Sequence, residues 1–197
     1  MKTLLVSAAL AASMILPAAA SAQAIPGAVV AVVDLDRVTG QCTACKTAAT
    51  ALRSQATALQ SRQTALAGPL ETEQKSIQTA IDALPQGKEP DAALQARVKA
   101  WQTKREQGAQ EISRGEQQLQ RNQAYINQQI RDKLGPIYQQ VMQRRGANLM
   151  VETGTTLATA SALDVTADVL TALNTAMPTV QTTAPAQAAT TKQPQGR

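Results

Sequence analysis

Residues 85–90 read Pro85-Gln-Gly-Lys-Glu-Pro90 and interrupt a sequence that otherwise favours helix from residue 43 to residue 145. Proline lacks the N–H that a helix needs for its hydrogen bonds, and glycine loses more conformational entropy in a helix than other residues do. Both residues therefore tend to end helices. The flanking stretches are rich in Ala, Gln, Leu, Lys, Arg and Glu, which have high helix propensity. A six-residue breaker predicts an antiparallel hairpin of two long helices over residues 43–134, with its tip at residues 85–90.

Short β-like segments lie on both sides of the predicted hairpin. Residues 28–33 form a continuous run rich in Val, and residues 149–157 read as a second strand. Asp164 suits the N-cap of a final helix over residues 165–177. The predicted fold class is therefore α+β, with a long coiled-coil hairpin projecting from a small β-containing oligomerisation body formed by residues 25–42 and 135–177.

Two strands are too few to bury both faces of a sheet. We therefore expect the body to be completed by other copies of the chain, with the apolar residues of the strands buried between them. The predicted body residues are Val30, Val32, Leu149 and Val151.

Apolar residues of the first predicted helix recur with the seven-residue period of a coiled coil. One series contains Cys45, Leu52, Leu59 and Leu66. The second, four positions further on, contains Ala49, Ala56, Leu70, Ile77 and Leu84, with Gln63 interrupting it. Because Ala and Gln bury less apolar surface than Leu, the predicted seam is uneven.

The second predicted helix has a strong apolar start, a thin middle and a strong end. Gly108, Gly115 and Asn122 occupy positions where a second apolar series is expected. Glycine in a helix interior costs about 0.5–1 kcal/mol relative to Ala, so this limb should bend and flex. Gly68-Pro69 and Gly135-Pro136 are either tolerated bends or hinges, and the second pair, near the body, is the better hinge candidate.

Residues 1–22 have the organisation of a secretory signal peptide. Lys2 supplies the positive charge, residues 4–16 an apolar run, and Ala20-Ser-Ala22 a cleavage signal of small residues. No later stretch approaches the roughly 20 apolar residues that span a bilayer. We therefore expect a soluble, exported protein of the periplasm.

The chain contains no His, which removes several classes of enzyme. Neither a Ser-His-Asp triad, a Cys-His nucleophile nor a His-ligated zinc site can be built. No motif brings carboxylates or a Ser–Lys pair together. The sequence predicts a protein that is not an enzyme, with no catalytic, cofactor-binding or metal-binding residues.

The predicted hairpin is basic. Residues 46–145 contain 15 Lys and Arg against nine Asp and Glu, a net charge of +6. Export and the scarcity of aromatic residues argue against nucleic acid, so acidic polypeptides or an anionic membrane surface fit better. The predicted partner-binding residues, near the tip and along the returning limb, are Leu94, Val98, Lys99, Trp101, Lys104, Arg105 and Arg114.

Cys42 and Cys45 form a C-x-x-C sequence at the start of the first long helix. In an oxidising compartment this favours a structural disulfide or inert thiols. A redox motif of the thioredoxin type would need a βαβ context that the sequence lacks. Residues 178–197 are mainly Thr, Ala, Gln and Pro, and we predict a disordered tail.

The order of these segments resembles the Skp (OmpH-like) family of periplasmic chaperones over residues 28–175. The similar motifs are Val30-Ala-Val-Val-Asp34, Gly135-Pro-Ile-Tyr-Gln-Gln-Val141, Asn148-Leu-Met-Val-Glu152 and Leu163-Asp-Val-Thr-Ala-Asp-Val-Leu170. The resemblance implies a homotrimer whose strands form a central body and whose hairpins surround a cavity. It also implies an ATP-independent holdase that binds unfolded outer-membrane proteins. The C-x-x-C, the tail and the glycine-interrupted limb depart from the family pattern.

Two other functions remain open at this point. A structural coiled-coil adaptor or spacer in a cell-envelope complex would also use a long hairpin. A redox protein would depend on Cys42 and Cys45, whereas a holdase would keep most of its activity without them.

Overall fold

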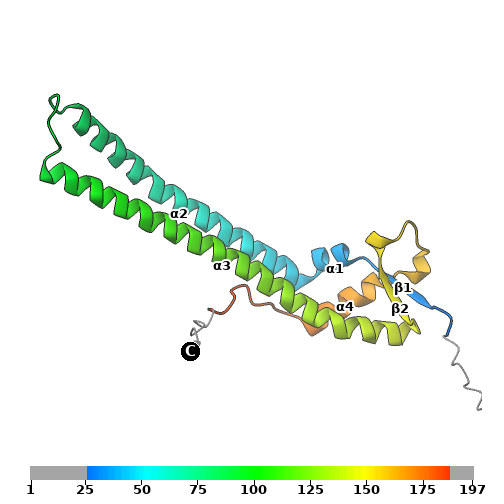
Figure 1. The fold of residues 1–197 in the computed structure, drawn as a ribbon. Helices are drawn as coiled ribbons and strands as arrows, with labels where there is room; N and C mark the ends of the chain where they lie inside the picture. Colours follow the sequence, from blue (N-terminus) through cyan, green and yellow to red (C-terminus); the bar gives the residue numbers. More distant parts are fainter. Residues whose placement is uncertain (1–25, 187–197) are drawn as a thin grey trace, which may run out of the picture.

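The computed structural model describes residues 26–186, which form a long helical hairpin and a small base (Figure 1). The helices and strands are β1 (Val30–Val33), α1 (Leu35–Gln41), α2 (Thr43–Asp82), α3 (Ala92–Arg145), β2 (Leu149–Glu152) and α4 (Thr166–Ala176). Two short 3-10 helices, Thr153–Thr155 and Ser161–Leu163, connect β2 to α4. The predicted fold class is confirmed. The predicted signal peptide, residues 1–22, lies outside the described residues.

Both long helices begin and end at residues that satisfy their free backbone groups. The Cys42 sulfur accepts a hydrogen bond from the Cys45 amide at the start of α2, and the Asp91 carboxylate accepts one from the Leu94 amide at the start of α3. At the tip, Gly87 has a φ of 80°, a left-handed conformation that favours glycine. Helix α3 ends at Gly146, which has a φ of 66°.

Both internal prolines lie within uninterrupted helices. Helix α2 continues through Pro69, and α3 continues through Pro136. Helix α3 therefore crosses the predicted boundary at residue 135 and connects the hairpin to the base as one element.

Strands β1 and β2 pair in parallel, with Val30 opposite Leu149 and Val33 opposite Glu152. The predicted second strand is too long, because the chain leaves the sheet at Thr153 and turns into a 3-10 helix. The Thr153 hydroxyl donates to the Val33 carbonyl at 3.0 Å and fixes this departure. At the other edge of β1, Val32 forms the one bridge found among residues 26–186, with Asp164.

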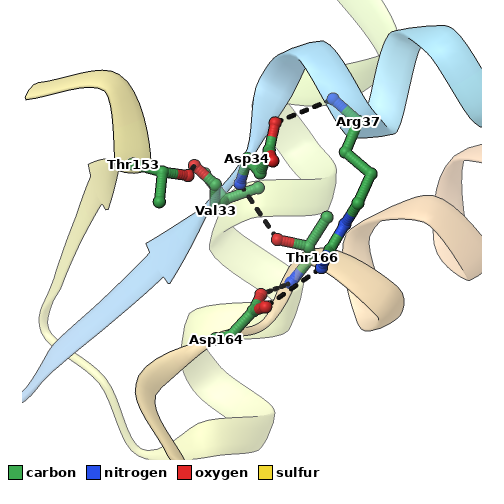
Figure 2. A network of polar contacts seen from close by, with 6 residues as sticks. All are labelled: Val33, Asp34, Arg37, Thr153, Asp164 and Thr166. Carbon is green, nitrogen blue, oxygen red and sulfur yellow. Dashed lines mark hydrogen bonds and ion pairs between the residues drawn. The ribbon is translucent and has the colours of Figure 1, made fainter. Parts of the chain in front are cut away.

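A polar network closes the end of β1 against α4 (Figure 2). The Thr166 hydroxyl accepts from the Asp34 amide at 2.9 Å, while the Thr166 amide donates to Asp164 at 2.8 Å. The Arg37 guanidinium donates to the same Asp164 carboxylate at 3.0 Å. Asp164 therefore precedes α4 as predicted, although the helix begins at Thr166 and its N-cap is Val165.

The main hydrophobic core lies in the base and in the adjoining part of the hairpin. It brings together residues from β1, α1, the start of α2, the last third of α3, and α4. Its buried members are Ala31, Val33, Val38, Cys42, Ala44, Cys45, Ala48, Ile126, Ile130, Leu134, Ile137, Val141, Val165, Val169, Leu173 and Met177.

The predicted second series of seam residues is wrong in the half of α2 nearer the base. Ala49, Ala56 and Gln63 are exposed, whereas Ala48 is buried and Gln55 is half-buried. Beyond Pro69 the burial pattern is displaced by one residue, so that Leu70, Ile77 and Leu84 do face the seam. Polar residues of one helix pair with polar residues of the other, and a pattern of hydrophobicity does not reveal such positions.

The segment after α4 also differs from the prediction. Residues 178–186 form neither helix nor strand, and they continue from α4 along the side of the hairpin (Figure 1). The Gln181 amide donates to Gln129 at 3.0 Å, and the Ala184 amide donates to Asn122 at 2.8 Å. These contacts order a segment whose own composition predicts disorder. The remaining predicted tail, residues 187–197, lies outside the described residues.

Candidate functional site

A groove of about 680 Å³ separates α2 and α3 in the outer half of the hairpin. It opens where Pro69 gives α2 a face without a long side chain, opposite the small residues Ala100 and Gly108 of α3. Leu66, Leu70 and Trp101 supply its apolar surface, and Arg62, Glu73, Arg97, Lys104 and Glu111 surround them. We call this hollow the Trp101 groove.

Trp101 is fixed in this groove by a hydrogen bond and by a cation. Its indole Nε1 donates to the Leu70 carbonyl at 2.9 Å, which ties α3 to α2. The Arg105 guanidinium lies 5.1 Å from the ring centroid, a cation–π distance. The ring stays only half-buried, so part of its apolar surface remains available to a partner.

Ion pairs between the two helices border the Trp101 groove. Arg97 lies 3.0 Å from Glu73, and Arg62 lies 2.6 Å from Glu111. The hydrogen bond from Arg62 is the main cause that lowers the pKa of the Glu111 carboxyl. Desolvation opposes this shift, while the charges of Arg62 and Arg114 add to it. Glu73 and Glu111 are thus each paired with an arginine. Lys104 also lines the groove, and among the described residues it takes part in no ion pair.

The structure brings only two of the predicted partner-binding residues, Trp101 and Lys104, into this groove. Leu94 is only 7 % exposed and packs at the tip, and Val98 is half-buried in the seam. Lys99, Arg105 and Arg114 are exposed on α3 and form no ion pair in the described part of the chain. The predicted set is therefore not a single site: it combines exposed cations, one half-buried aromatic residue and two aliphatic residues of the seam and tip.

The predicted body residues differ in their exposure. Val32 is already buried within one protomer, at 2 % exposed, whereas Leu149 is 46 % exposed. Val30 and Val151 are half-buried. Within residues 26–186, strand β2 pairs only with β1, so its outer edge and Leu149 lack a covering element in this part of the chain.

Cys42 and Cys45 are joined by a disulfide in the core of the base. Cys42 is completely buried, and Cys45 is 8 % exposed. Reactive cysteines need an accessible and electropositive surrounding, which this apolar position does not provide. The bond connects the end of α1 to the first turn of α2.

Sequence reasoning missed a row of amide side chains on the hairpin. Gln55 of α2 and Gln118, Asn122 and Gln129 of α3 all bond to the backbone of residues 181–184. We call these four residues the amide strip. Their spacing on α3, with Gln118, Asn122 and Gln129 on one face, is the only sequence signal that could have indicated it.

Within residues 26–186, no group of three or more Cys, Asp or Glu side chains is arranged to hold a metal ion. Among the helices of the same residues, none is both long and apolar enough to cross a bilayer.

Comparison with known proteins gives one family and related folds. The family model described as "Outer membrane protein (OmpH-like)" matches residues 29–173. Among solved structures, a protein from Caulobacter crescentus CB15, described as a candidate outer membrane chaperone (OmpH-like), superposes with a TM-score of 0.67 at 18% sequence identity. The match covers 84% of this chain and 95% of that one, which establishes a shared fold. No curated protein sequence matches significantly.

Proposed function

Because this chain belongs to the OmpH-like family, we propose that it is an ATP-independent holdase chaperone of the periplasm. Its clients would be unfolded outer-membrane proteins, which it binds after export and keeps from aggregating. The structural neighbour described as a candidate outer membrane chaperone supports the chaperone class. On this proposal the protein has no catalytic step.

The observation that carries the proposal is the open character of the outer hairpin. The Trp101 groove lies along an exposed limb, and Lys99, Arg105 and Arg114 are exposed around and beyond it. Such a surface offers apolar contacts and positive charge to a long chain, and it encloses no small ligand. Many weak contacts of this kind suit clients that differ in sequence.

We further propose that the working form is a homotrimer. The uncovered edge of β2 and the exposed Leu149 support assembly through the base, since an unpaired strand edge readily pairs with another chain. Three hairpins fixed at one end would then surround a client. Val32 is a poor test residue, because its burial within the protomer couples assembly to folding. Leu149→Asp is the better variant, and sedimentation equilibrium should show it dissociating into folded protomers.

The direct test is aggregation of a urea-unfolded outer-membrane β-barrel protein after dilution from denaturant. One trimer per client, without ATP, should suppress light scattering and keep the client in solution. A structural adaptor should leave scattering unchanged, and this outcome would reject the holdase proposal.

The contribution of charge can be tested by reversing Lys99, Lys104, Arg105 and Arg114 to Glu together. Capture of an acidic unfolded client should slow about tenfold at low salt, because long-range attraction raises association rates. The matched control reverses four exposed cations nearer the base, Lys46, Arg53, Arg131 and Lys133, and keeps the same net charge. Stopped-flow fluorescence measures both. Equal slowing in the two variants would assign the effect to net charge alone.

A further inference from the structure

The segment that follows α4 makes its hydrogen bonds to the hairpin through its backbone. Gln129 both accepts from the Gln181 amide at 3.0 Å and donates to the Gln181 carbonyl at 2.9 Å. A primary amide that does both reproduces the pair of hydrogen bonds that two β-strands exchange. The Gln129 side chain therefore makes the two hydrogen bonds that a neighbouring β-strand would make, although Gln129 belongs to a helix.

The rest of the amide strip continues this recognition. Asn122 accepts from the Ala184 amide at 2.8 Å, Gln55 donates to the Thr182 carbonyl at 3.3 Å, and Gln118 donates to the Ala184 carbonyl at 3.4 Å. None of these bonds involves a side chain of the segment. Recognition through the backbone does not depend on sequence.

The strip is pre-organised by bonds among its own members. Asn122 is only 4 % exposed; it donates to Gln55 at 2.8 Å and accepts from Gln118 at 2.7 Å. The amides of α2 and α3 are thus oriented by each other. A second peptide segment would meet donors and acceptors that are already in place, which reduces the entropy lost on binding.

The middle of the bound segment, residues 180–184, alternates in exposure as a β-strand does. Val180, Thr182 and Ala184 are half-buried against the hairpin, while Gln181 and Thr183 between them are exposed. The inward side chains are small or β-branched, so the surface accepts such residues at every second position. Strands of outer-membrane barrels also alternate between apolar and polar residues.

We propose that the amide strip is a binding site for extended polypeptide backbone, and that residues 178–186 occupy it until a client segment displaces them. This inference rests on the proposed holdase function and specifies one of its client sites. The occupant's chemistry is an extended strand with free N–H groups and small residues at alternate positions.

Proline substitution tests displacement without touching the strip. Gln181→Pro with Ala184→Pro removes the two N–H groups that the strip accepts, and should free the segment. The control, Thr183→Pro, removes an N–H that donates to no part of the strip. The probe is a fluorescent nine-residue peptide with the sequence of residues 178–186, followed by anisotropy. The double variant should bind it about tenfold more tightly than the wild type or the control, since its internal segment has lost two of the five hydrogen bonds that hold it on the strip.

The same probe tests the chemistry of the site. Methylation of its amide nitrogens at the positions of Gln181 and Ala184 should abolish binding, whereas methylation at the position of Thr183 should not. In the double variant, Gln129→Met should weaken binding of the unmethylated probe. Equal affinity of the proline double variant and the Thr183→Pro control for the peptide would overturn the proposal, as would binding insensitive to methylation.

Client binding is measured on the same preparations with the unfolded barrel protein. The double variant should capture it more tightly than Thr183→Pro. Suppression of aggregation with no difference between these variants would overturn the strip proposal and leave the holdase function standing. Loss of suppression in every preparation, including the wild type, would instead reject the holdase function.

Discussion

In the part of α3 nearest the base, Ile126, Ile130 and Leu134 are at most 8 % exposed and pack into the main core. In its outer half, Ile112 and Leu119 are only half-buried, and the seam also contains Gly108 and Gly115, which lie against Leu66 and Leu59 of α2. The same two helices are therefore joined by aliphatic packing at one end, and by isolated leucines, glycines and exposed ion pairs at the other.

The two ends should consequently differ in local stability. Buried aliphatic side chains contribute about 1.5–3 kcal/mol each, whereas exposed ion pairs contribute about 0–1 kcal/mol. Regions with few buried contacts open locally well below the global free energy of unfolding. A rigid base and a readily opened limb suit a protein that must adapt to partners of different size.

The largest expected effect comes from the core of the base. Leu173 is completely buried in α4, and Leu173→Ala should lower the free energy of unfolding by about 2–5 kcal/mol. Leu66→Ala in the half-buried outer seam should cost only about 1 kcal/mol. Urea denaturation at fixed protomer concentration compares the two variants. Equal losses of unfolding free energy in the two variants would contradict the proposed difference in stability between the base and the outer limb.

The disulfide tests the base by another route. In Cys42→Ala with Cys45→Ala, loss of a four-residue loop closure should lower stability by about 2 kcal/mol. Hydrogen exchange should locate this loss in α1 and the start of α2, with the outer limb unchanged. Suppression of aggregation should persist, and its loss would favour a redox role for these cysteines.

The glycines of the outer seam offer a finer comparison. A Cβ at Gly108 would lie 3.7 Å from Leu66 Cδ1, whereas a Cβ at Gly115 would lie 2.5 Å from Leu59 Cδ1. Gly108→Ala should therefore stabilise the limb by about 0.5–1 kcal/mol, while Gly115→Ala should forfeit this gain because Leu59 has to move. Hydrogen exchange of the α3 amides measures both. Combining Gly115→Ala with Leu59→Ala should remove the steric conflict but lose Leu59 packing.

The smallest expected effect is a pH dependence of the base. Hydrogen bonds from the side chain and amide of Thr166, with a further contribution from Arg37, lower the pKa of the Asp164 carboxyl. A carboxyl with a depressed folded-state pKa stabilises the fold above its unfolded pKa, and loses this contribution as the pH falls through the folded value. Asp164→Asn should thus lower the free energy of unfolding by less than about 1 kcal/mol at about pH 7, because Asp164 and Arg37 are both exposed. Below the folded-state pKa of Asp164, the substitution should have almost no effect.

Urea midpoints between neutral and acidic pH measure this dependence. Glu111→Gln is the control on the outer limb, because the pKa of Glu111 is also lowered, by Arg62. It should leave unfolding of the base unchanged. A pH dependence shared by both variants would contradict a local origin at Asp164.

The helices were predictable because their signals are local. The breaker at residues 85–90 separates α2 from α3, and the Val-rich run defines β1. The strand β2 ends earlier than predicted because a contact from Thr153 to β1, 120 positions away, redirects the chain. Contacts between distant residues leave no periodic trace in the sequence.

The candidate site was predictable only in part. Trp101 and Lys104 stood out as an aromatic residue and a cation on a basic limb, and the structure places both in one groove. The groove itself depends on Pro69 and Gly108 from different helices. The amide strip was missed because Gln and Asn in a helical limb read as ordinary solvated residues until the segment that they bind is in place.

The parallel pairing of β1 with β2 has a consequence for the order in which the chain can assemble. Val29 and Asn148, which bond beside the sheet, are 119 positions apart. Closing a flexible loop of that length costs about 3 kcal/mol more than closing one of about five residues. The antiparallel hairpin places Asn148 beside Val29, and each pairing step from the tip toward the base closes only a short loop. The long limb is thus also the means by which two remote ends of the polypeptide find each other.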